Sequence, residues 1–373
     1  MTKEMKILHI GNLKSGIDTY VRNTVALADN RFDFVIVNGA DDKSEPYMRH
    51  GKALKQYSID MYRALNPVKD LKAVIQAMKI IRKEKPDVVH CHSAKGGVIG
   101  RFASFLTGTK SFYTPHAFSF LSAESPKKAR IFLMLERIAK LNSRMLACSE
   151  SEKELGMEKI PFSKDKAFAW PNAIADIKED DIKQPEGLNP KERFIISVGR
   201  PSYQKNPLLM VETMRLVHEK HPGVNFLLVG VGFYSPMLDE MNALIAKYNL
   251  QNTIKLLPWC SREETLGYVR QSLFYLTTSL YEGLPIAVLE ALALGKAIVS
   301  SDVIGNNDCV KDGYNGCLLQ FDEKSFADAC CKLIENESLR KEQGDNSRKL
   351  FEEKFLIDNR IKELENIYLS VTK

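Results

Sequence analysis

The sequence predicts an α/β protein with two doubly wound domains, on the basis of three observations. Short apolar runs of four to seven residues alternate with helical stretches along most of the chain, which is the pattern of parallel sheets covered by helices on both faces. The length of 373 residues exceeds what one hydrophobic core usually supports. The alternation is interrupted once, over residues 170–191, and then starts again.

Five segments of the first half are expected to be buried strands: Lys6–Ile10, Phe32–Asn38, Asp87–His92, Ser111–Thr114 and Arg144–Cys148. Residues 67–84 and 127–142 are expected to be helices. Ligands of such sheets bind beyond the carboxyl ends of the strands. The loops found there are GNLKSG (Gly11–Gly16), HCHSAKGG (His90–Gly97) and Pro115-His116, so these three loops are candidates for a binding site.

Residues 170–191 are rich in proline and charged side chains and poor in apolar ones, which is typical of an inter-domain connection. The domain boundary is therefore expected there, with domains over residues 1–172 and 173–355. The second half repeats the pattern, with strands expected at Phe194–Val198, Asn225–Val229, Thr253–Leu257, Phe274–Thr278 and Ala297–Ser300. Helices are expected near 206–220, 235–248, 261–271 and 285–294, and three more near 323–335, 338–353 and 356–371.

Composition narrows the class of protein. Apolar residues make up 44% and charged residues 27% of the chain, so disordered and fibrous classes are excluded. Neither a signal peptide nor a membrane span is expected, because no apolar stretch reaches the roughly 18 residues that a span needs. Seven cysteines without a C-x-x-C pair favour reduced thiols and a cytoplasmic location.

The charge is unevenly distributed. Residues 1–173 carry 29 Lys and Arg against 18 Asp and Glu, a net +11, which leaves 24 against 29, a net −5, for residues 174–373. A basic surface suits nucleic acid, anionic lipid or phosphorylated substrates, and charge alone leaves these three open.

One basic segment stands out, SPKKARIFLMLERIAKLNSRM at residues 125–145. Its cations are Lys127, Lys128, Arg130, Arg137, Lys140 and Arg144, and its apolar side chains include Phe132, Leu133, Leu135, Ile138 and Leu141. A helix of this composition either packs on the core with a solvated basic side or contacts an anionic membrane surface, which here would be the inner face of the plasma membrane.

The segment SLYEGLPIAVLE (Ser279–Glu290) is the most informative motif. Pro285 is expected to start a helix, which leaves amides near Gly283 and Leu284 available to an anion. Glu282 and Glu290 stand on either side of this turn, and a carboxylate can accept two hydroxyl groups at once. The pattern therefore suggests a phosphate on the amides with polyols beside it, although each glutamate alone could be a solvated side chain.

Arg200 and Lys205 follow the first strand of the second domain, with Gln204 and Asn206 beside Lys205. An arginine fork and a lysine point charge at this position are suited to a diphosphate. The alternative is a pair of surface cations. Because this loop and the Ser279–Glu290 turn are expected at the same sheet edge, the diphosphate interpretation is favoured.

Histidines also follow strands of the first domain. His116 comes after a strand and a proline, where it can reach a ligand or bond to the backbone. His90 and His92 flank Cys91, but a metal site is not expected there, on the argument that alternate strand residues face opposite sides. The chain contains no Asp-x-Asp pair for a metal that bridges a nucleotide diphosphate, so no metal is expected.

With these motifs the chain resembles the retaining glycosyltransferases of family 4, which have the GT-B fold. The resemblance covers nearly the whole chain. It is carried by the E-x7-E pair Glu282 and Glu290 with GLP between, by Gly199-Arg200 with Lys205-Asn206, by the first glycine-containing loop and by His116. The HSAKGG and YTPHAFSF stretches are similar to members that build bacterial surface polysaccharides.

The resemblance implies two Rossmann-like domains facing across a cleft, with the donor held mainly by the second, the acceptor mainly by the first, and a C-terminal helix at about 356–373 that crosses back to the first. Donor-binding roles are implied for Gly16, Arg200, Lys205, Trp259, Glu282, Gly283, Leu284 and Glu290. His116 and Glu282 are the expected catalytic residues, and His116 would touch the sugar near the reaction centre. Ser93 and Lys95 are expected on the acceptor side.

The implied chemistry is transfer of a hexose-type sugar from a nucleotide diphosphate, with UDP favoured, to a lipid-linked or glycan acceptor, with retention and without a metal cofactor. Nucleic acid is not an expected partner, whereas peripheral contact with an anionic membrane is. A GT-B epimerase and a non-catalytic nucleotide-sugar-binding subunit remain alternatives. A hydride-transferring Rossmann enzyme is disfavoured, because neither first strand is followed by G-x-G-x-x-G.

Three positions depart from the family pattern. Ser15-Gly16 replaces the double glycine of the first loop, and Asn172-Ala173 stands where Asn-Gly is common. Gly305-Asn306-Asn307-Asp308 replaces a frequent G-x-x-E run near the donor pocket, which leaves the identity of the sugar open.

Overall fold

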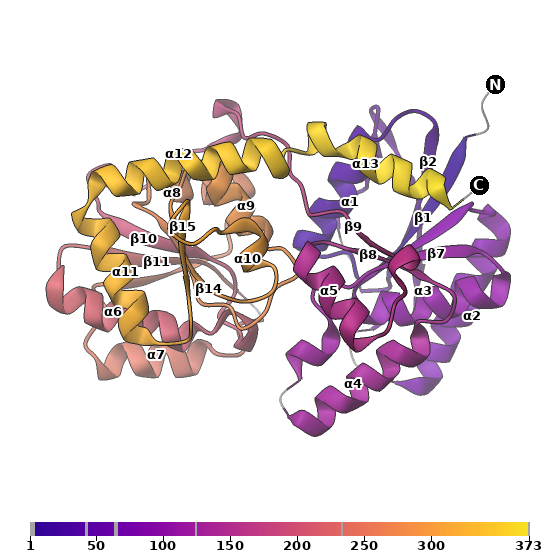
Figure 1. The fold of residues 1–373 in the computed structure, drawn as a ribbon, viewed down its shortest axis with the longest axis horizontal. Helices are drawn as coiled ribbons and strands as arrows, with labels where there is room; N and C mark the ends of the chain where they lie inside the picture. Colours follow the sequence, from indigo (N-terminus) through magenta and orange to yellow (C-terminus); the bar gives the residue numbers. More distant parts are fainter. Residues whose placement is uncertain (1–3, 42–43, 63–65, 124, 233, 372–373) are drawn as a thin grey trace. The chain divides into compact units, whose positions relative to one another are not determined.

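The computed structural model describes residues 4–41, 44–62, 66–123, 125–232 and 234–371. The chain forms two compact units (Figure 1). Unit 1 comprises Met1–Ala175 together with Ile357–Lys373, and unit 2 comprises Asp176–Leu356.

Unit 1 contains a seven-stranded sheet in the order β5-β2-β1-β6-β7-β8-β9, with every neighbouring pair parallel. The strands are β1 (Met5–Gly11), β2 (Phe32–Gly39), β5 (Lys55–Ile59), β6 (Val88–His92), β7 (Lys110–Thr114), β8 (Arg144–Ala147) and β9 (Ala167–Ala169). A short antiparallel pair, β3 (Met48–Arg49) and β4 (Lys52–Ala53), lies outside this sheet. The helices are α1 (Gly16–Leu27), α2 (Pro67–Glu84), α3 (Ser93–Thr107), α4 (Pro126–Ala139), α5 (Glu150–Lys159) and α13 (Ile357–Ser370).

Two cores cover the two faces of this sheet. Side chains of α1 and α13 pack with Phe34 and Ile36 of β2 on one face, and side chains of α2 and α3 pack with Val35 and Val37 on the other. Successive residues of β2 therefore serve opposite cores, as strand geometry requires. A sheet with both faces buried explains why its strands appear in the sequence as continuous apolar runs.

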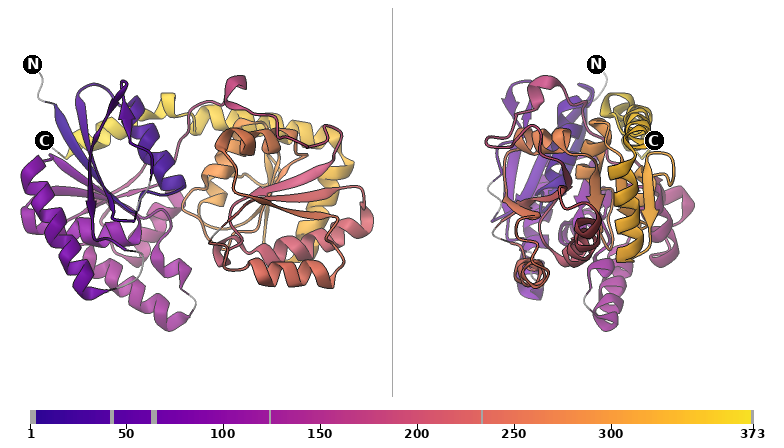
Figure 2. Two further views of the ribbon diagram at one scale, coloured as in Figure 1. Left: turned by 180° about the vertical axis from the view of Figure 1, so that it is seen from behind. Right: turned by 90° about the vertical axis from the view of Figure 1, so that its left-hand side faces the viewer.

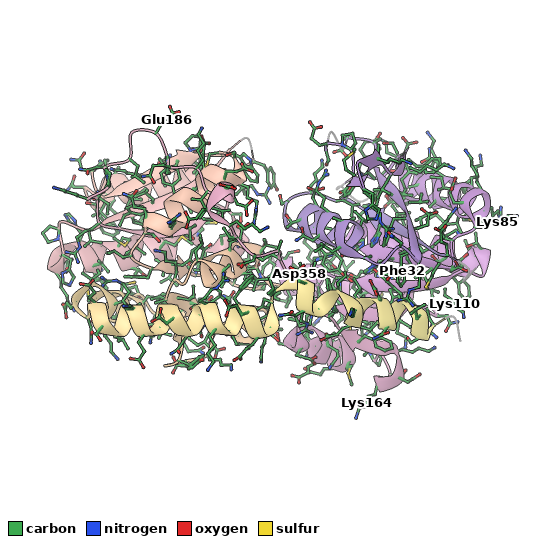
Figure 3. All side chains as sticks on the ribbon, turned by 90° about the horizontal axis from the view of Figure 1, so that it is seen from above. Phe32, Lys85, Lys110, Lys164, Glu186 and Asp358 are labelled. Atoms are coloured by element: carbon green, nitrogen blue, oxygen red, sulfur yellow. The ribbon has the colours of Figure 1, made fainter. Side chains whose placement is uncertain are left out.

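The C-terminal helix α13 belongs to unit 1, as expected. The ring of Tyr368 is tilted against that of Phe32, with 6.2 Å between the ring centroids, and Lys110 donates a hydrogen bond to the carbonyl of Val371. Figure 3 shows α13 with Phe32 and Lys110 beside it. The indole nitrogen of Trp170 also donates to the carbonyl of Arg360 at 3.0 Å. The last two residues of the predicted segment lie outside the described part of the chain.

Unit 2 contains a six-stranded parallel sheet in the order β12-β11-β10-β13-β14-β15. The strands are β10 (Phe194–Val198), β11 (Asn225–Val231), β12 (Ile254–Pro258), β13 (Tyr275–Thr277), β14 (Ile298–Ser301) and β15 (Gly316–Leu319). The helices are α6 (Pro207–Lys220), α7 (Leu238–Lys247), α8 (Arg262–Gln271), α9 (Ile286–Ala293), α10 (Asn306–Cys309), α11 (Glu323–Glu335) and α12 (Glu337–Lys354). Figure 2 shows the strands between α6 and α7 on one side and α8 and α9 on the other.

These observations confirm the predicted fold class. The ten strands expected from apolar runs are present, with ends shifted by at most two residues. Helix α2 begins at the predicted residue, because Asn66 caps it by accepting from the amide of Lys69 at 3.0 Å and Pro67 occupies its first turn. Strands β5, β9 and β15 were not predicted, because they lie at sheet edges and are short or partly exposed.

Helix α3 was also not assigned, because its glycines lower helix propensity. The structure shows why they are there. A β-carbon at Gly96 would lie 2.5 Å from the Cα atom of Gly11, and one at Gly97 would lie 2.3 Å from the ring of Tyr113. The glycines let α3 approach the sheet closely, and the packing energy outweighs the propensity.

A buried ion pair ties α3 to α4. Arg101 Nη2 lies 2.8 Å from Glu136 Oε2, and both side chains are almost completely buried. The hydroxyl of Tyr113 donates to the other oxygen of Glu136 at 2.8 Å.

Among the described residues, no helix is both long and apolar enough to cross a membrane.

Candidate active site

The topology of unit 2 brings two loops together at the centre of its sheet. Residues 199–205 follow β10, residues 278–285 follow β13, and these two strands are neighbours. The strand order reverses between them, since β11 and β12 lie beyond β10 and β14 and β15 lie beyond β13. In open α/β sheets this switch point, at the carboxyl ends of the strands, is where ligands bind.

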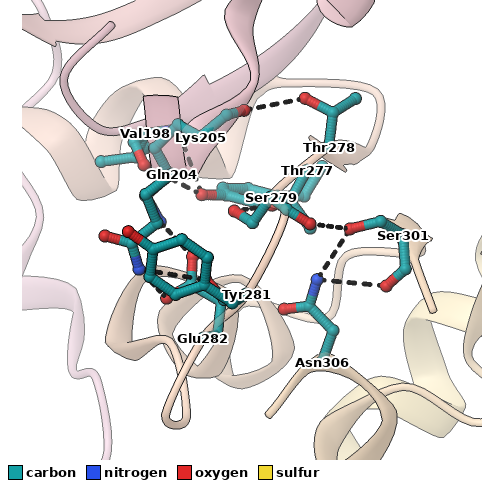
Figure 4. Close-up of polar contacts among 11 residues, drawn as sticks. Val198, Gln204, Lys205, Thr277, Thr278, Ser279, Tyr281, Glu282, Ser301 and Asn306 are labelled. Carbon is teal, nitrogen blue, oxygen red and sulfur yellow. Dashed lines mark hydrogen bonds and ion pairs between the residues drawn. The ribbon is translucent and has the colours of Figure 1, made fainter. Parts of the chain in front are cut away.

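The side chains of these loops form an ion pair (Figure 4). Lys205 Nζ lies 2.7 Å from Glu282 Oε1. The amide nitrogen of Gln204 donates to Glu282 Oε2 and to the carbonyl of Tyr281, both at 3.1 Å. Glu282 is only 6% exposed, so its carboxylate is held by two partners in a largely desolvated position. Lys205 and Glu282 were both predicted as site residues, and the structure brings them together. Gln204 is a second hydrogen-bond donor to the Glu282 carboxylate.

Hydrogen bonds to main-chain carbonyl groups hold the two loops together. The amide of Leu280 donates to the carbonyl of Gln204 at 2.8 Å, and the hydroxyl of Thr278 donates to the carbonyl of Lys205 at 2.9 Å (Figure 4). On the other side, Ser301 donates to the carbonyl of Ser279 at 2.6 Å. The position of Glu282 is therefore set from both neighbouring strands.

The residues Gly305-Asn306-Asn307-Asp308 lie directly behind this turn. Gly305 has φ +83°, and a β-carbon there would lie 2.6 Å from the carbonyl oxygen of Gly283. The side-chain amide of Asn306 donates to Ser301 at 3.2 Å (Figure 4). Gly305 and Asn306 of this run therefore support the Glu282 turn.

Helix α9 begins one residue later than predicted. Pro285 is the capping residue, with φ −75° and ψ 116°, and its carbonyl accepts from the amide of Leu289 at 3.2 Å. The expectation that Pro285 is the first helical residue was therefore wrong by one position. Because the carbonyl of the capping residue already accepts, the first free amides of the helix follow the proline.

Glu290 lies on α9 and is paired with a residue that the sequence analysis missed. Arg262 Nε lies 2.7 Å from Glu290 Oε1, with 45% of the arginine side chain and 11% of the glutamate side chain exposed. Burial raises the pKa of Glu290, while Arg262 acts in the opposite direction. One signal could have identified Arg262: it is a cation in the first turn of α8, where the helix dipole disfavours positive charge.

Arg200 and Trp259 lie at the same edge of the sheet. Arg200 follows β10 and places its guanidinium 5.3 Å from the ring centroid of Tyr234. Trp259 follows β12, two strands away from β10, and is 64% exposed. Leu284 is buried, at 4% exposed, next to Gly283.

In unit 1 the candidate residues gather at the switch point between β1 and β6. Gly16 is the first residue of α1 after β1, and Ser93 is the first residue of α3 after β6. Lys95 is already paired, with its ammonium 2.8 Å from both carboxylate oxygens of Asp70 on α2. Lys95 therefore ties the start of α3 to α2.

Four histidines of unit 1 form one cluster. His9 Nδ1 lies 2.8 Å from His92 Nε2, and His92 Nδ1 lies 3.1 Å from His116 Nε2. The ring centroids of His90 and His92 are 4.1 Å apart. The argument that His90 and His92 face opposite sides was wrong, because residues two apart on a strand share a face.

Burial dominates the electrostatics of this cluster. It lowers the pKa of His9 and of His116 to about 3. It also lowers the pKa of His90 and His92 well below the usual value, with a further contribution from the neighbouring histidines. All four rings are therefore neutral at physiological pH.

One ligand atom from each of His9, His90 and His92 lies within 4.8 Å of the other two, which is compatible with a bound metal ion. However, five of their six ring nitrogens already have hydrogen-bond partners, and His9 Nε2 is the exception. The cluster fits a hydrogen-bonded network better than a vacant metal site.

His116 has an unusual backbone. It has φ +51° and the following Ala117 has φ +77°, values that non-glycine residues rarely adopt and that often mark functional sites. Glu152 stabilises this turn: its fully buried carboxylate accepts from the amide of Ala117 at 2.7 Å and from the amide of Cys148 at 2.9 Å. Sequence reasoning missed Glu152, which looks like an ordinary surface residue of α5.

The fold and these residues define a class of protein. Residues 14–176 match the family model described as Glycosyltransferase Family 4, and residues 178–350 match the one described as Glycosyl transferases group 1. The chain belongs to this family of glycosyltransferases and has its GT-B fold of two Rossmann-like units.

Particular relatives agree with this assignment. The chain is 29% identical over 325 residues to the UDP-Gal:alpha-D-GlcNAc-diphosphoundecaprenol alpha-1,3-galactosyltransferase of Escherichia coli, covering 83% of this chain and 82% of the relative. It is 26% identical over 391 residues to the capsular polysaccharide biosynthesis glycosyltransferase CapM of Staphylococcus aureus, covering 100% and 98%. Among solved structures, sucrose-phosphate synthase from Thermosynechococcus elongatus has a TM-score of 0.82 at 16% identity, covering 99% of each chain.

Proposed function

We propose that the protein transfers a sugar from a UDP-sugar to a lipid-linked acceptor during synthesis of a cell-surface polysaccharide, with retention of configuration and without a metal ion. The observation that carries this proposal is the pairing of Lys205 with Glu282 at the switch point of unit 2, next to the buried Glu290. The names of the Escherichia coli and Staphylococcus aureus relatives support the choice of UDP, of a lipid diphosphate acceptor and of the pathway class.

In this proposal unit 2 holds the donor. Lys205 keeps its bond to Glu282 and uses its remaining N–H groups for the diphosphate, since an ammonium has three donors. Arg200 binds the same diphosphate through its fork, and the first turn of α9 contributes its amides and dipole. These groups stabilise the negative charge that develops on the leaving UDP, which is the role that a metal ion would otherwise have.

The other donor contacts follow from the chemistry of the side chains. Glu282 accepts from hydroxyl groups of the sugar, and Glu290 accepts from the ribose hydroxyls. Gly283 and Leu284 contact the phosphates through their backbone, and Trp259 flanks the uracil ring with its exposed indole.

Unit 1 is assigned to the acceptor. Ser93 and Lys95 at the start of α3 would contact it. Gly16 at the start of α1 would instead serve the donor, because a glycine allows the donor phosphates to approach closely. His116 would contact the reacting sugar. In this proposal residues 176–356 mainly bind the donor, and residues 1–175 with 357–373 mainly bind the acceptor.

An assay with purified protein tests the proposal. We expect a UDP-hexose and a lipid-diphosphate-linked N-acetylglucosamine to yield a product with the anomeric configuration of the donor, and activity to persist in EDTA. Lys205→Ala and Glu282→Ala should each lower kcat/KM by about 10²- to 10³-fold, the cost of removing one stabilising group from a desolvated site. Lys220→Ala is the matched control, because Lys220 pairs with Asp328 on the surface.

The outcomes separate the alternatives. Near-normal turnover in both site variants would refute the assignment of the site. Isomerisation of the donor without acceptor would indicate an epimerase, and donor binding without turnover on any acceptor would indicate a non-catalytic subunit. Loss of activity in EDTA that Mg²⁺ restores would refute metal independence.

The lipid part of the proposal places the protein in the cytoplasm at the inner membrane face, and it is supported by α4. Ile131, Met134 and Ile138 are 45%, 52% and 52% exposed and lie three and four residues apart on one face of the helix. Lysines and arginines flank them, as on helices that lie in a membrane surface. Phe132, Leu133 and Leu135 are instead half-buried against unit 1. Of the fourteen large hydrophobic residues found exposed in the described part of the chain, ten belong to unit 1.

Sedimentation with liposomes tests this part. We expect binding to vesicles that contain anionic phospholipid at low salt, no binding to neutral vesicles, and loss of binding when Met134→Ser and Ile138→Ser are combined. Phe321→Ser in unit 2 is the control, because Phe321 is similarly exposed at 48%. Failure of the wild type to bind anionic vesicles would remove the membrane contact from the proposal.

A further inference from the structure

A row of hydrogen bonds connects three histidine rings of unit 1. His9 lies at one end, on β1, with 0% exposure. His92 at the end of β6 is the middle ring, joined to His9 at 2.8 Å and to His116 at 3.1 Å. His116 forms the other end and is partly exposed. Since all three rings are neutral, each carries one N–H. Both hydrogen bonds of the row must therefore be donated in the same direction, either from His116 towards His9 or from His9 towards His116.

For His90, which lies beside this row, the donor and acceptor of each hydrogen bond can be deduced from its partners. The hydroxyl of Thr114 donates to the carbonyl of Leu146 at 2.6 Å, because a carbonyl only accepts. Thr114 must therefore accept from His90 Nε2 at 2.7 Å. His90 then accepts from the hydroxyl of Tyr368 with Nδ1, at 2.7 Å. Its contacts fix the tautomer of His90 independently of the row.

The row itself has two possible directions, which differ at the buried end. If His116 donates to His92 and His92 to His9, the proton of His9 lies on Nε2. If His9 donates to His92 and His92 to His116, Nε2 of His9 carries only a lone pair. Nε2 of His9 is buried and has no hydrogen-bond partner among the described residues. A buried N–H without an acceptor is rarer in proteins than a buried acceptor without a donor. Donation from His9 to His92 and from His92 to His116 is therefore favoured.

The second direction has a consequence for the exposed end. His116 Nε2 accepts from His92, so the proton of His116 lies on Nδ1. Nδ1 makes no hydrogen bond within the described part of the chain, whereas Nε2 does. The buried carboxylate of Glu152 accepts from the amide of Ala117 and so stabilises the backbone turn that carries the His116 ring.

We propose that His9 and His92 are positioning residues that hold His116 in the Nδ1–H tautomer, so that His116 presents a hydrogen-bond donor to the substrate. The chemical consequence rests on the proposed function, in which His116 contacts the reacting sugar. An Nδ1–H group donates to a sugar hydroxyl or to an oxygen that gains negative charge, and it cannot act there as a base. The tautomer itself is independent of that function.

Nuclear magnetic resonance of protein labelled with ¹⁵N-histidine tests the tautomer directly. The chain has seven histidines, and the signals of His116 can be assigned by their loss in His116→Gln. We expect a protonated Nδ1 and an unprotonated Nε2 in the wild-type protein. A protonated Nε2 would overturn the proposal, and so would a stoichiometric zinc ion found by elemental analysis, because the three buried rings would then be metal ligands.

Two variants with similar structural cost test the positioning role. His92→Phe removes both hydrogen bonds of the middle ring, and His90→Phe removes a ring that is equally buried on the same strand but outside the row. We expect His92→Phe to change the tautomer of His116 or to leave it as a mixture, and His90→Phe to leave it unchanged. An unchanged His116 in His92→Phe would overturn the role of His92.

Kinetics supply a second measurement. We expect His92→Phe to lower kcat about tenfold, the loss for one neutral hydrogen bond in the transition state, while its affinity for UDP stays within about twofold. Equal losses of kcat in His92→Phe and His90→Phe would show a merely structural effect and overturn the role. Absence of transfer by the wild-type protein would instead refute the proposed function. The resonance measurements on the wild-type protein would still test the tautomer in that case, and also in the case that His92→Phe does not fold.

Discussion

Replacing Arg262 by glutamine should change the pH dependence of UDP binding. In the proposed function Glu290 accepts from the ribose hydroxyls, so binding requires its ionised form. Burial already raises the pKa of Glu290, and Arg262 is the cation that offsets this effect. UDP binding should therefore weaken as the pH falls and the carboxylate becomes protonated, and this weakening should begin at a higher pH in Arg262→Gln.

The magnitude follows from the geometry of the pair. A hydrogen bond between charged groups contributes about 1.5–3 kcal/mol. The lower end applies here, because 45% of the Arg262 side chain is exposed and water screens its charge. About 1.4 kcal/mol corresponds to one pH unit, so the midpoint of the binding profile should rise by about one unit.

Isothermal titration calorimetry of UDP at several pH values between about 4 and 8 measures this midpoint. The titration of UDP itself is common to all variants and cancels in the difference. Arg270→Gln is the control, because Arg270 lies in the last turn of the same helix and pairs with Glu179 on the surface. Identical profiles for Arg262→Gln and the wild type would refute the argument that Glu290 must be ionised to bind the donor.

Three further substitutions test how the site is supported. Glu152→Gln should lower the free energy of unfolding by about 1–3 kcal/mol in urea, because one buried amide loses its acceptor; an unchanged midpoint would contradict the role given to the Ala117 turn. Gly305→Ala should weaken UDP binding, since its methyl group would lie 2.6 Å from a carbonyl oxygen of the turn after β13. Gly313→Ala is the control, because Gly313 has φ +71° but open space around it, so this substitution should have only the backbone cost of about 1 kcal/mol. Equal effects of Gly305→Ala and Gly313→Ala on UDP binding would exclude the steric explanation. Arg101→Met should destabilise unit 1 by about 3–5 kcal/mol because it removes the cation that pairs with a buried carboxylate, and a loss below about 1 kcal/mol would contradict this contribution of the ion pair.

The fold could be predicted from the sequence largely because its strands are buried on both faces. Strands such as β10 and β2 are continuous apolar runs between helices, so their positions follow from composition. The edge strand β5 could not be found in this way, because Lys55, Gln56 and Ser58 on it are exposed. Its place is fixed by pairing with β2, which is a tertiary contact.

The site in unit 2 was partly predictable for a topological reason. Arg200, Lys205 and Glu282 follow strands whose carboxyl ends meet at one sheet edge, whatever the detailed packing. The partner of Glu290 was not predictable from spacing, because Arg262 reaches it from a different helix. Only its unfavourable position at a helix N-terminus gave a local signal.

The histidine cluster shows how the parity and register of strands determine which residues meet. His90 and His92 share a face because the side-chain period of a strand is two residues, and correct use of that period would have paired them from the sequence. His9 joins them because β1 and β6 are neighbours and His9 lies opposite His90 in their register. A shift of one residue in that register would turn His9 to the other face of the sheet and would leave His92 without its inner partner. The tautomer proposed for His116 therefore depends on the pairing of two strands at the switch point, and no motif around His116 encodes it.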